Sequence, residues 1–345
     1  MSTASSLPAA GPKPVDKILE AALGFMATAA IHAVARLGVA DLLKDGPVHV
    51  SCLAKSTATN QDALYRVLRA LASNGIFTET APRTFALTPP AQLLVKDAPG
   101  SQRDMVLWMG DPCHFRTFPE LLHSIKTGET VVERVYGASC FEFLEKDKAT
   151  GEIFNNAMTG FSASVIPAVL ESYDFSFLQG KTLVDIAGGH GMLITSILKK
   201  YPAARGILMD LPHVLEGAKQ RLAAEGLSDR CALASGDFFK EVPSGDAYIM
   251  KHIIHDWDDE RAGIILRNIG RASAAGAQVI FLETPVLSGD APQIVKWLDL
   301  EMLMLPGGRE RTEAEYRALF SANGFQLSRV IPTKSPLNIL EAVRL

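Results

Sequence analysis

Cysteine is scarce in this chain, with four residues among 345. Cys52, Cys113, Cys140 and Cys231 lie far apart, and no two of them have the CxxC spacing of zinc and redox sites. So few cysteines in so long a chain argue against a disulfide framework. We therefore expect buried, reduced thiols and no structural zinc site.

The chain also lacks an excess of positive charge. It has 34 Lys and Arg against 38 Asp and Glu, which gives a net charge of -4 and a pI near 6.1, and the basic residues are dispersed. Proteins that bind nucleic acid or anionic membranes gain affinity from clustered cations. We therefore expect neither nucleic acid nor a membrane among the partners.

A signal-peptide core and a membrane-spanning run are absent as well. Residues 1–14, MSTASSLPAAGPKP, are small, polar and proline-rich, and we expect a disordered lead-in there. No uninterrupted apolar run approaches the roughly 20 residues that a membrane helix needs. The sequence therefore predicts a soluble, cytoplasmic protein.

What the chain does contain is an ordinary globular composition, 48% hydrophobic and 21% charged, at a length that suits one large domain and an accessory one. In the first part, residues 18–43 carry apolar residues at helical intervals. Asn60 has the character of a helix cap, and Asn74–Gly75 ends that helix. IFTET and RTFALT then alternate like two short strands.

Helices followed by a two-stranded hairpin predict a winged-helix domain over residues 15–104. The most specific function that such a domain suggests is DNA binding. The candidate recognition helix, QDALYRVLRALAS, has only Arg66 and Arg69 as cations, too few to neutralise phosphates. Burial against a second subunit better explains the apolar first helix. We therefore favour dimerisation.

Residues 105–173 are mostly helical in character and rich in Phe and Met, which predicts a linker that builds a substrate pocket. Four side chains are candidates for the pocket lining: Trp108, Phe115, Met158 and Phe161. Such a stripe also occurs as plain core, and spacing alone does not separate the two.

Residues 174–345 alternate between strand and helix. Short apolar runs such as TLVDIA, RGILMDL, AYIM and AQVIFLE predict buried strands, and the segments between them have helical period. This alternation predicts a doubly wound parallel sheet, and the closing runs QLSRVIP and LNILEAVRL predict a hairpin.

A glycine-rich turn, AGGHG, follows the first of these strands and precedes a helix, which is where such sheets bind nucleotides. NAD is a competitor, but Ile194 stands where a dinucleotide motif needs its third small residue. Asp185, Asp210 and Asp237 lie in or at the ends of three successive strands. Asp210 can accept hydrogen bonds from ribose hydroxyls, and Asp237 can accept one from the amine of an adenine. A dinucleotide enzyme needs the first acid but has no particular use for the second.

Together these motifs resemble a known family. VDIAGGHG, ILMDLPHVLEGA, SGDFFKEVP, IMKHIIHDWDDE, IFLETPV and LDLEMLMLPGGRERTEAEY occur in that order. The chain resembles, over nearly its whole length, the S-adenosylmethionine-dependent small-molecule O-methyltransferases of the caffeate, isoflavone and hydroxyindole O-methyltransferase type. The resemblance implies a Rossmann-like class I methyltransferase domain and an N-terminal winged-helix domain that forms a homodimer. Ala187 departs from the family pattern, which usually has glycine there.

The resemblance also implies site residues. For S-adenosylmethionine these are Ser162, Asp185, Gly188, Gly189, Gly191, Asp210, Leu211, Asp237, Phe238 and Lys251. For an aromatic acceptor, Asp256 and Trp257 would lie at the pocket rim, and Met302 and Leu305 would face the ring.

The stretch HIIHDWDDE carries the expected chemistry. A neutral imidazole can accept a phenol's proton near neutral pH, and a carboxylate then fixes its tautomer. The resemblance assigns the base to His255 and the flanking acids to Glu283, which we expect to orient it, and Glu310. Without the resemblance, Glu310 would be a surface acid paired with a neighbouring arginine. His252 has no evident partner, and the acids from 258 to 260 suit a helix cap.

Other functions stay open. The same scaffold could methylate nitrogen or carbon, or use the cofactor without methyl transfer, and a ligand-sensing DNA-binding regulator is a third class. No cluster with metal-ligand spacing is visible, so we expect a metal-free mechanism. The acceptor is a small hydroxylated aromatic in the leading hypothesis, and its identity is not encoded in these motifs.

Overall fold

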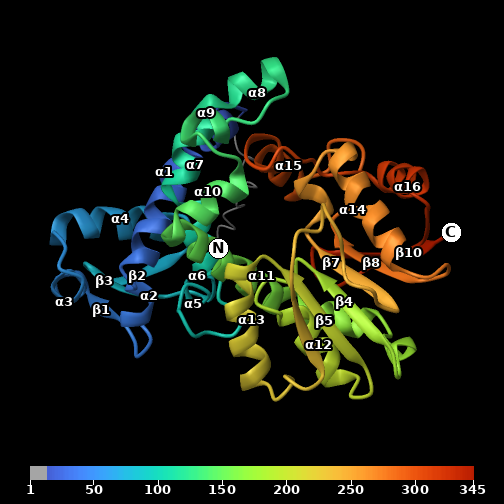
Figure 1. Cartoon of the computed structure of the whole chain (residues 1–345). Coiled ribbons are helices and arrows are strands. Elements are labelled where there is room, and N and C mark those ends of the chain that lie inside the picture. Colours follow the sequence, from blue (N-terminus) through green and yellow to red (C-terminus); the bar gives the residue numbers. More distant parts are fainter. Residues whose placement is uncertain (1–13) are drawn as a thin grey trace, which may run out of the picture. The chain divides into compact units, whose positions relative to one another are not determined.

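The structure, a computed structural model, describes residues 14–345 (Figure 1). The lead-in predicted for residues 1–14 therefore lies outside the described residues, except that Pro14 already begins a helix. The chain divides into two compact units, between Asp111 and Pro112. Each unit has apolar core clusters of its own.

The N-terminal unit combines helices with a small sheet. Its elements are α1 (Pro14–Arg36), α2 (Val39–Leu42), β1 (Val48–His49), α3 (Val50–Ser56), α4 (Gln61–Ser73), β2 (Phe77–Ala81), β3 (Thr84–Leu87), α5 (Pro89–Gln92) and α6 (Arg103–Met109). The Asn60 side chain caps α4 by accepting from two backbone N–H groups, as expected. Helices, hairpin and their order follow the prediction. The short β1 was not predicted, and it makes the sheet three-stranded, in the order β1-β3-β2.

Helix α1 leaves many apolar side chains uncovered in a single chain. Exposed along it are Val15, Ile18, Leu19, Leu23, Phe25 and Met26. By length and composition alone, α1 and α11 (Lys148–Ser172) are each apolar enough to cross a membrane. We expected no run of that length. Their apolar stretches are interrupted, but alanines, larger apolar residues and a scarcity of charge keep the average hydropathy high.

The C-terminal unit is built on a seven-stranded sheet in the order β6-β5-β4-β7-β8-β10-β9. The strands are β4 (Thr182–Ile186), β5 (Arg205–Asp210), β6 (Cys231–Ser235), β7 (Ala247–Lys251), β8 (Gln278–Glu283), β9 (Phe325–Pro332) and β10 (Asn338–Arg344). Strands β4 to β8 are parallel, and β10 runs antiparallel to β8 and β9. The predicted parallel sheet and closing hairpin are confirmed. The strand order reverses next to β4, so ligands are expected at its carboxyl end.

Both faces of this sheet are buried, which explains the continuous apolar runs. In β4, Leu183 packs into one apolar cluster and Val184 into the opposite one. Helices α11, α12 (Met192–Lys200) and α13 (Pro212–Ala224) supply the first cluster, and α14 (Asp259–Ala272) and α16 (Glu313–Ala322) supply the second. The sheet thus holds the carboxyl ends of its strands rigidly in one row.

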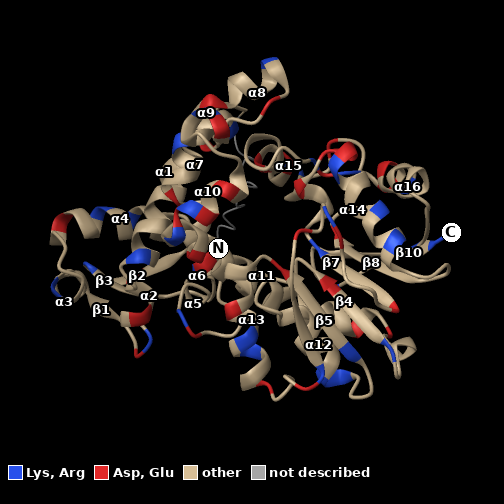
Figure 2. Cartoon of the chain, in the orientation of Figure 1, with Lys and Arg blue, Asp and Glu red and all other residues tan. Residues whose placement is uncertain are grey.

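The remaining α-helices of this unit lie before β4 or in the connection between β8 and β9. They are α7 (Pro112–Thr117), α8 (Leu121–Thr127), α9 (Val132–Tyr136), α10 (Cys140–Lys146) and α15 (Val295–Met304). A short 3-10 helix, η3 (Ile254–Asp256), follows β7. Figure 2 shows acidic and basic residues interspersed over both units, in line with the dispersed charges of the sequence.

Candidate active site

The glycine-rich turn after β4 has an unusual backbone. Ala187, Gly189 and Gly191 all have positive φ, at 54°, 58° and 75°. A Cβ atom on Gly188 would lie 2.7 Å from Asp185 Oδ2, so this position has no room for a side chain. The turn therefore presents bare backbone at the start of α12, where free N–H groups can meet a ligand.

Two acids lie at this turn, and one of them, Asp210, holds its backbone. The Gly189 N–H donates to Asp210 Oδ2 at 2.8 Å, and the Leu211 N–H donates to Asp210 Oδ1. Asp185 is buried, and burial raises its pKa to about 7 despite the nearby Lys251. Its Oδ2 has no hydrogen-bond partner among the described residues. An unpartnered carboxylate oxygen at this place suits a ligand that donates hydrogen bonds.

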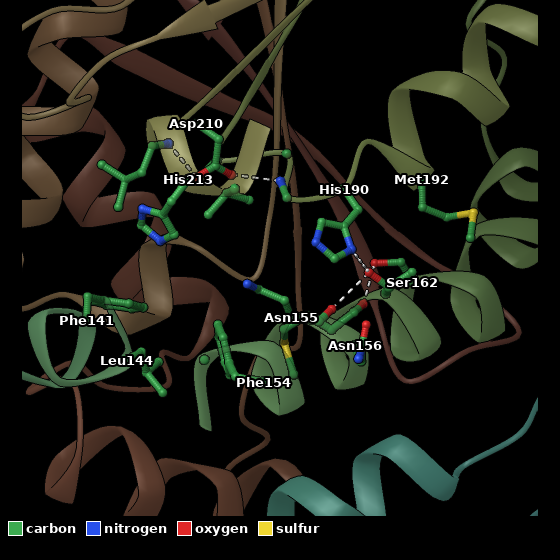
Figure 3. Close-up of a pocket in the computed structure, with 18 of the residues that line it drawn as sticks. Phe141, Leu144, Phe154, Asn155, Asn156, Ser162, His190, Met192, Asp210 and His213 are labelled. Atoms are coloured by element: carbon green, nitrogen blue, oxygen red, sulfur yellow. Dashed lines mark hydrogen bonds between the residues drawn. The ribbon is translucent and has the colours of Figure 1, made fainter. Parts of the chain in front are cut away.

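A cavity of about 830 Å³ opens over the turn, which is the size of a small-ligand site. Ten residues singled out in the sequence line it: Met158, Ser162, Asp185, Ala187, Gly188, Gly189, Asp210, Leu211, Lys251 and Asp256. Figure 3 shows Asp210 and His190 on one side of the cavity and Phe154 of α11 on the other. The structure thus brings most of the predicted cofactor residues together.

Several lining residues were not singled out in the sequence. From α10 and α11 these include Phe141, Leu144, Phe154, Asn155, Asn156 and Thr159, and from the sheet edge His190, His213 and His252. His190 Nδ1 lies 3.0 Å from Thr159 Oγ1, which ties the glycine turn to α11. The sequence feature that could have indicated His190 is its position inside AGGHG, because a large side chain between the small residues of this turn stands out.

Other predicted residues do not line this cavity. Gly191 begins α12 behind it, and Asp237 accepts from the Phe239 N–H and pairs with Lys240. Trp257 is buried in the apolar core instead of at a pocket rim, and the half-buried Phe238 packs against its ring. Phe115 is half-exposed, and Trp108, Met302 and Leu305 are buried, with Trp108 in the N-terminal unit. Phe161 reaches the site indirectly, by stacking on His252.

His255 is buried in η3 between two carboxylates. Its Nδ1 lies 2.7 Å from Glu310 Oε1, and its Nε2 lies 3.5 Å from Asp256 Oδ1. Burial alone would lower the pKa of His255, but Asp256, Glu310 and Glu283 outweigh it and raise the pKa to about 10. Glu310 is therefore neither exposed nor paired with an arginine side chain.

The expected orienting role of Glu283 needs correction. Glu283 Oε1 accepts from the backbone N–H groups of Ile253 and Ile254, at 3.3 and 3.1 Å, and so supports the loop rather than the imidazole. The carboxylate in hydrogen-bond contact with His255 is Glu310. Burial raises the pKa of Glu283 to about 7.

Two residues that the sequence did not single out hold Glu310 in place. A Cβ atom on Gly308 would overlap the backbone of His255, so the two loops pack closely only because this residue is glycine. Arg311 is buried and donates to the carbonyls of Ile254 and Trp257 and to the Asp259 carboxylate. Asp259 thus binds Arg311, and Asp258 caps α14 as expected.

His252 lies closer to the site than expected. Its φ of 52° turns the ring onto Phe161, 5.0 Å away, and to within 4.5 Å of the His255 ring. Burial lowers its pKa well below 6.5, and Nε2 is buried with no partner in the described part of the chain. His252, for which the sequence indicates no partner, therefore lines the cavity.

Comparisons with known proteins show the family of this chain. Residues 118–326 match the family model of an O-methyltransferase domain, and residues 19–97 match that of an O-methyltransferase dimerisation domain. A phenazine O-methyltransferase of Lysobacter antibioticus is 44% identical over 335 residues, which cover 96% of this chain and 97% of that protein. An 8-amino-8-demethylriboflavin N,N-dimethyltransferase of Streptomyces davaonensis is 31% identical, with 90% of each chain covered.

Solved structures extend the likeness to three dimensions. The crystal structure of LaPhzM matches with a TM-score of 0.90 and 43% identity, covering 96% of this chain and 100% of that one. That of CalO1, a methyltransferase in calicheamicin biosynthesis in its S-adenosylhomocysteine-bound form, matches with a TM-score of 0.83 and 31% identity, covering 97% and 100%.

Proposed function

Because the chain belongs to the family of S-adenosylmethionine-dependent O-methyltransferases, we propose that it methylates a hydroxyl group of a small polycyclic aromatic such as a hydroxyphenazine. The observation that carries this proposal is the buried His255–Glu310 pair directly beside the cavity wall formed by His252 and Asp256. Methylation of a hydroxyl requires a place for its proton, and this pair supplies one.

The cavity suits the cofactor. Bare backbone at Gly188 and Gly189 and the unpartnered Asp185 Oδ2 match a ligand with an amino-acid end and a ribose. Seven residues of the cavity lining are proposed to hold S-adenosylmethionine: Ser162, Asp185, Gly188, Gly189, Asp210, Leu211 and Lys251. Gly191, Asp237 and Phe238 lie outside the lining, and their proposed contact with the cofactor rests on the resemblance alone. When bound, the cofactor supplies a methyl group activated by a positively charged sulfonium.

His255 is the proposed general base. With its pKa at about 10, it holds a proton at neutral pH in the free protein. A positive charge in the adjacent cavity would lower this pKa and so favour the neutral imidazole that a base requires. His255 Nε2 would then accept the proton of the acceptor's hydroxyl, and Glu310 would stabilise the resulting imidazolium.

The test uses 1-hydroxyphenazine as acceptor, with product mass and NMR to locate the methyl group. We expect an O-methyl product, and we expect His255→Ala to lower the rate about 10²–10⁴-fold. S-adenosylhomocysteine binding, measured by calorimetry, should persist in this variant. Unchanged turnover in His255→Ala would remove the proposed base.

N-methylation is the second candidate, because a relative 31% identical is an N,N-dimethyltransferase. It is distinguished by the same NMR analysis with an aminophenazine offered in competition. A product methylated on nitrogen in preference to oxygen would favour this candidate.

The N-terminal unit serves association rather than DNA binding in this proposal. The exposed apolar side chains of α1 and the matching dimerisation domain support a homodimer. A soluble, cytoplasmic enzyme with a winged-helix-like dimerisation domain, and with no nucleic-acid or membrane partner, stays part of the proposal.

A further inference from the structure

Three side chains of the C-terminal unit converge on one point. His252, His255 and Glu283 each offer one ligand-type atom, and these atoms lie within 4.8 Å of one another. Two imidazoles and one carboxylate arranged in this way are a ligand set for first-row transition metals. We propose that these three side chains bind a divalent transition metal such as Zn²⁺, and that the ion inhibits methyl transfer by occupying the imidazole of His255. The inhibition rests on the proposed function, whereas the binding does not.

His255 and Glu283 are each anchored through one atom, which leaves another atom for a ligand. The Nδ1 atom of His255 is held by Glu310 at 2.7 Å, so Nε2, which lies 3.5 Å from Asp256 Oδ1, is the atom that can meet a metal. Oε1 of Glu283 accepts from two backbone N–H groups. Oε2 is buried and makes no close hydrogen bond within the described residues, and the Tyr316 hydroxyl is a neighbouring donor of this carboxylate. A ligand fixed from behind by a hydrogen bond is the usual design of a metal site.

His252 is positioned for the same point by its backbone. Its φ of 52° is a conformation that residues other than glycine rarely adopt, and its ring is held by stacking on Phe161. Nε2 is buried and unpartnered within the described residues, and the ring centroid lies 4.5 Å from that of His255. Strain of this kind persists where surrounding contacts impose it, which is common at ligand sites.

The surrounding charge favours a cation over a neutral water molecule. Asp256 and Glu310 both contact the His255 ring, and Glu283 lies close to it, so three carboxylates neighbour this imidazole, against the buried cation Lys251. Buried carboxylates are stabilised by a nearby positive charge. Since His252 and Asp256 line the cavity, an ion can enter from there.

The first experiment titrates untagged, EDTA-treated and dialysed protein with Zn²⁺ against a coloured indicator. We expect one ion per chain, with affinity reduced about tenfold or more in Glu310→Gln, where only the support of a ligand is lost. His252→Gln and Glu283→Gln, which each lose a ligand, should bind more weakly still. His213→Gln removes another cavity histidine outside the set and should keep the wild-type affinity. Melting curves show which variants are folded.

Diffraction from wild-type crystals soaked in Zn²⁺, measured at the zinc absorption edge, locates the ion without any variant. A peak among the three side chains supports the site. A peak elsewhere, no binding at all, or equal binding by His252→Gln overturns it.

Inhibition is measured separately, with 1-hydroxyphenazine as acceptor. Zn²⁺ should stop methylation, and EDTA should restore it. If no acceptor is methylated, the proposed function fails while titration and diffraction still decide the metal site. If methylation proceeds but Zn²⁺ does not bind, only the metal site fails.

Discussion

His255 and Glu310 are 55 residues apart in the chain, yet Nδ1 of the first lies 2.7 Å from Oε1 of the second. Both side chains are almost fully buried. Two loops make this contact possible, because Gly308 packs against the backbone of His255, and the Arg309 N–H donates to the His255 carbonyl. The pair is thus a product of loop packing as much as of side-chain affinity.

Glu310→Gln should lower kcat more than Glu283→Gln does. The amide retains the shape but removes the negative charge that stabilises the imidazolium, and comparable losses in catalytic triads reach about 10⁴-fold. Glu283 acts on backbone N–H groups, and its loss should therefore appear mainly as reduced thermal stability. Initial rates and melting temperatures of both variants test this order, and a larger rate loss in Glu283→Gln would contradict it.

The stability of the protein should fall as pH rises from 7 to 10. The pKa of His255 is about 10 in the folded chain against an ordinary value of 6.5 for a solvated histidine, so its proton stabilises the fold fully below pH 6.5. That contribution is lost as pH rises through 10. Urea unfolding at pH 7 and 9.5 measures the decline, and His255→Gln should show a smaller decline. An equal decline in both proteins would show that other groups cause it.

Gly188→Ala should abolish cofactor binding, whereas Ala187→Gly should not. A methyl group on Gly188 would collide with the Asp185 carboxylate and fill the bare backbone of the turn. Ala187 already has a φ of 54°, a conformation that costs an L-residue about 1–2 kcal/mol, so glycine relieves strain there. Calorimetric titration with S-adenosylhomocysteine compares the two variants. Wild-type affinity in Gly188→Ala would separate the turn from the cofactor.

Arg311→Met should destabilise the fold by about 1–3 kcal/mol for each buried carbonyl that it leaves without a donor. These are the carbonyls of Ile254 and Trp257, whereas the Asp259 carboxylate is exposed and can be hydrated. Lys334→Met is the control, since its pair with Glu171 is exposed and should contribute less than about 1 kcal/mol. Denaturant unfolding gives both values, and similar losses in the two variants would refute the argument.

Leu23→Asp should convert a dimer into monomers. Leu23 is 49% exposed on α1, and a charge in an apolar interface is strongly unfavourable. Leu287→Asp places the same charge on a leucine that is 58% exposed in the other unit, and should leave assembly unchanged. Light scattering after size exclusion gives the mass. A dimer that persists in Leu23→Asp would place the interface away from this part of α1.

Much of the fold could be predicted from local patterns in the sequence. Parallel strands with two buried faces must be apolar along their length, so β4, β5, β7 and β8 are readable as short runs. The turn from 187 to 191 and the cap at Asn60 are equally local, because backbone conformation there depends on one or two residues. The two-residue β1 escaped prediction, since it exists only through pairing with β3.

Only part of the candidate site could be predicted from the sequence. The sequence by itself determined that Asp185, Asp210 and the glycine turn meet at one sheet edge, because the carboxyl ends of parallel strands share that edge. Tertiary structure decided which glutamate contacts His255, that Trp257 is core, and that His252 faces the cavity. These outcomes depend on how loops far apart in the sequence pack against each other. The sequence of one loop has no periodic pattern that indicates which other loop it will contact.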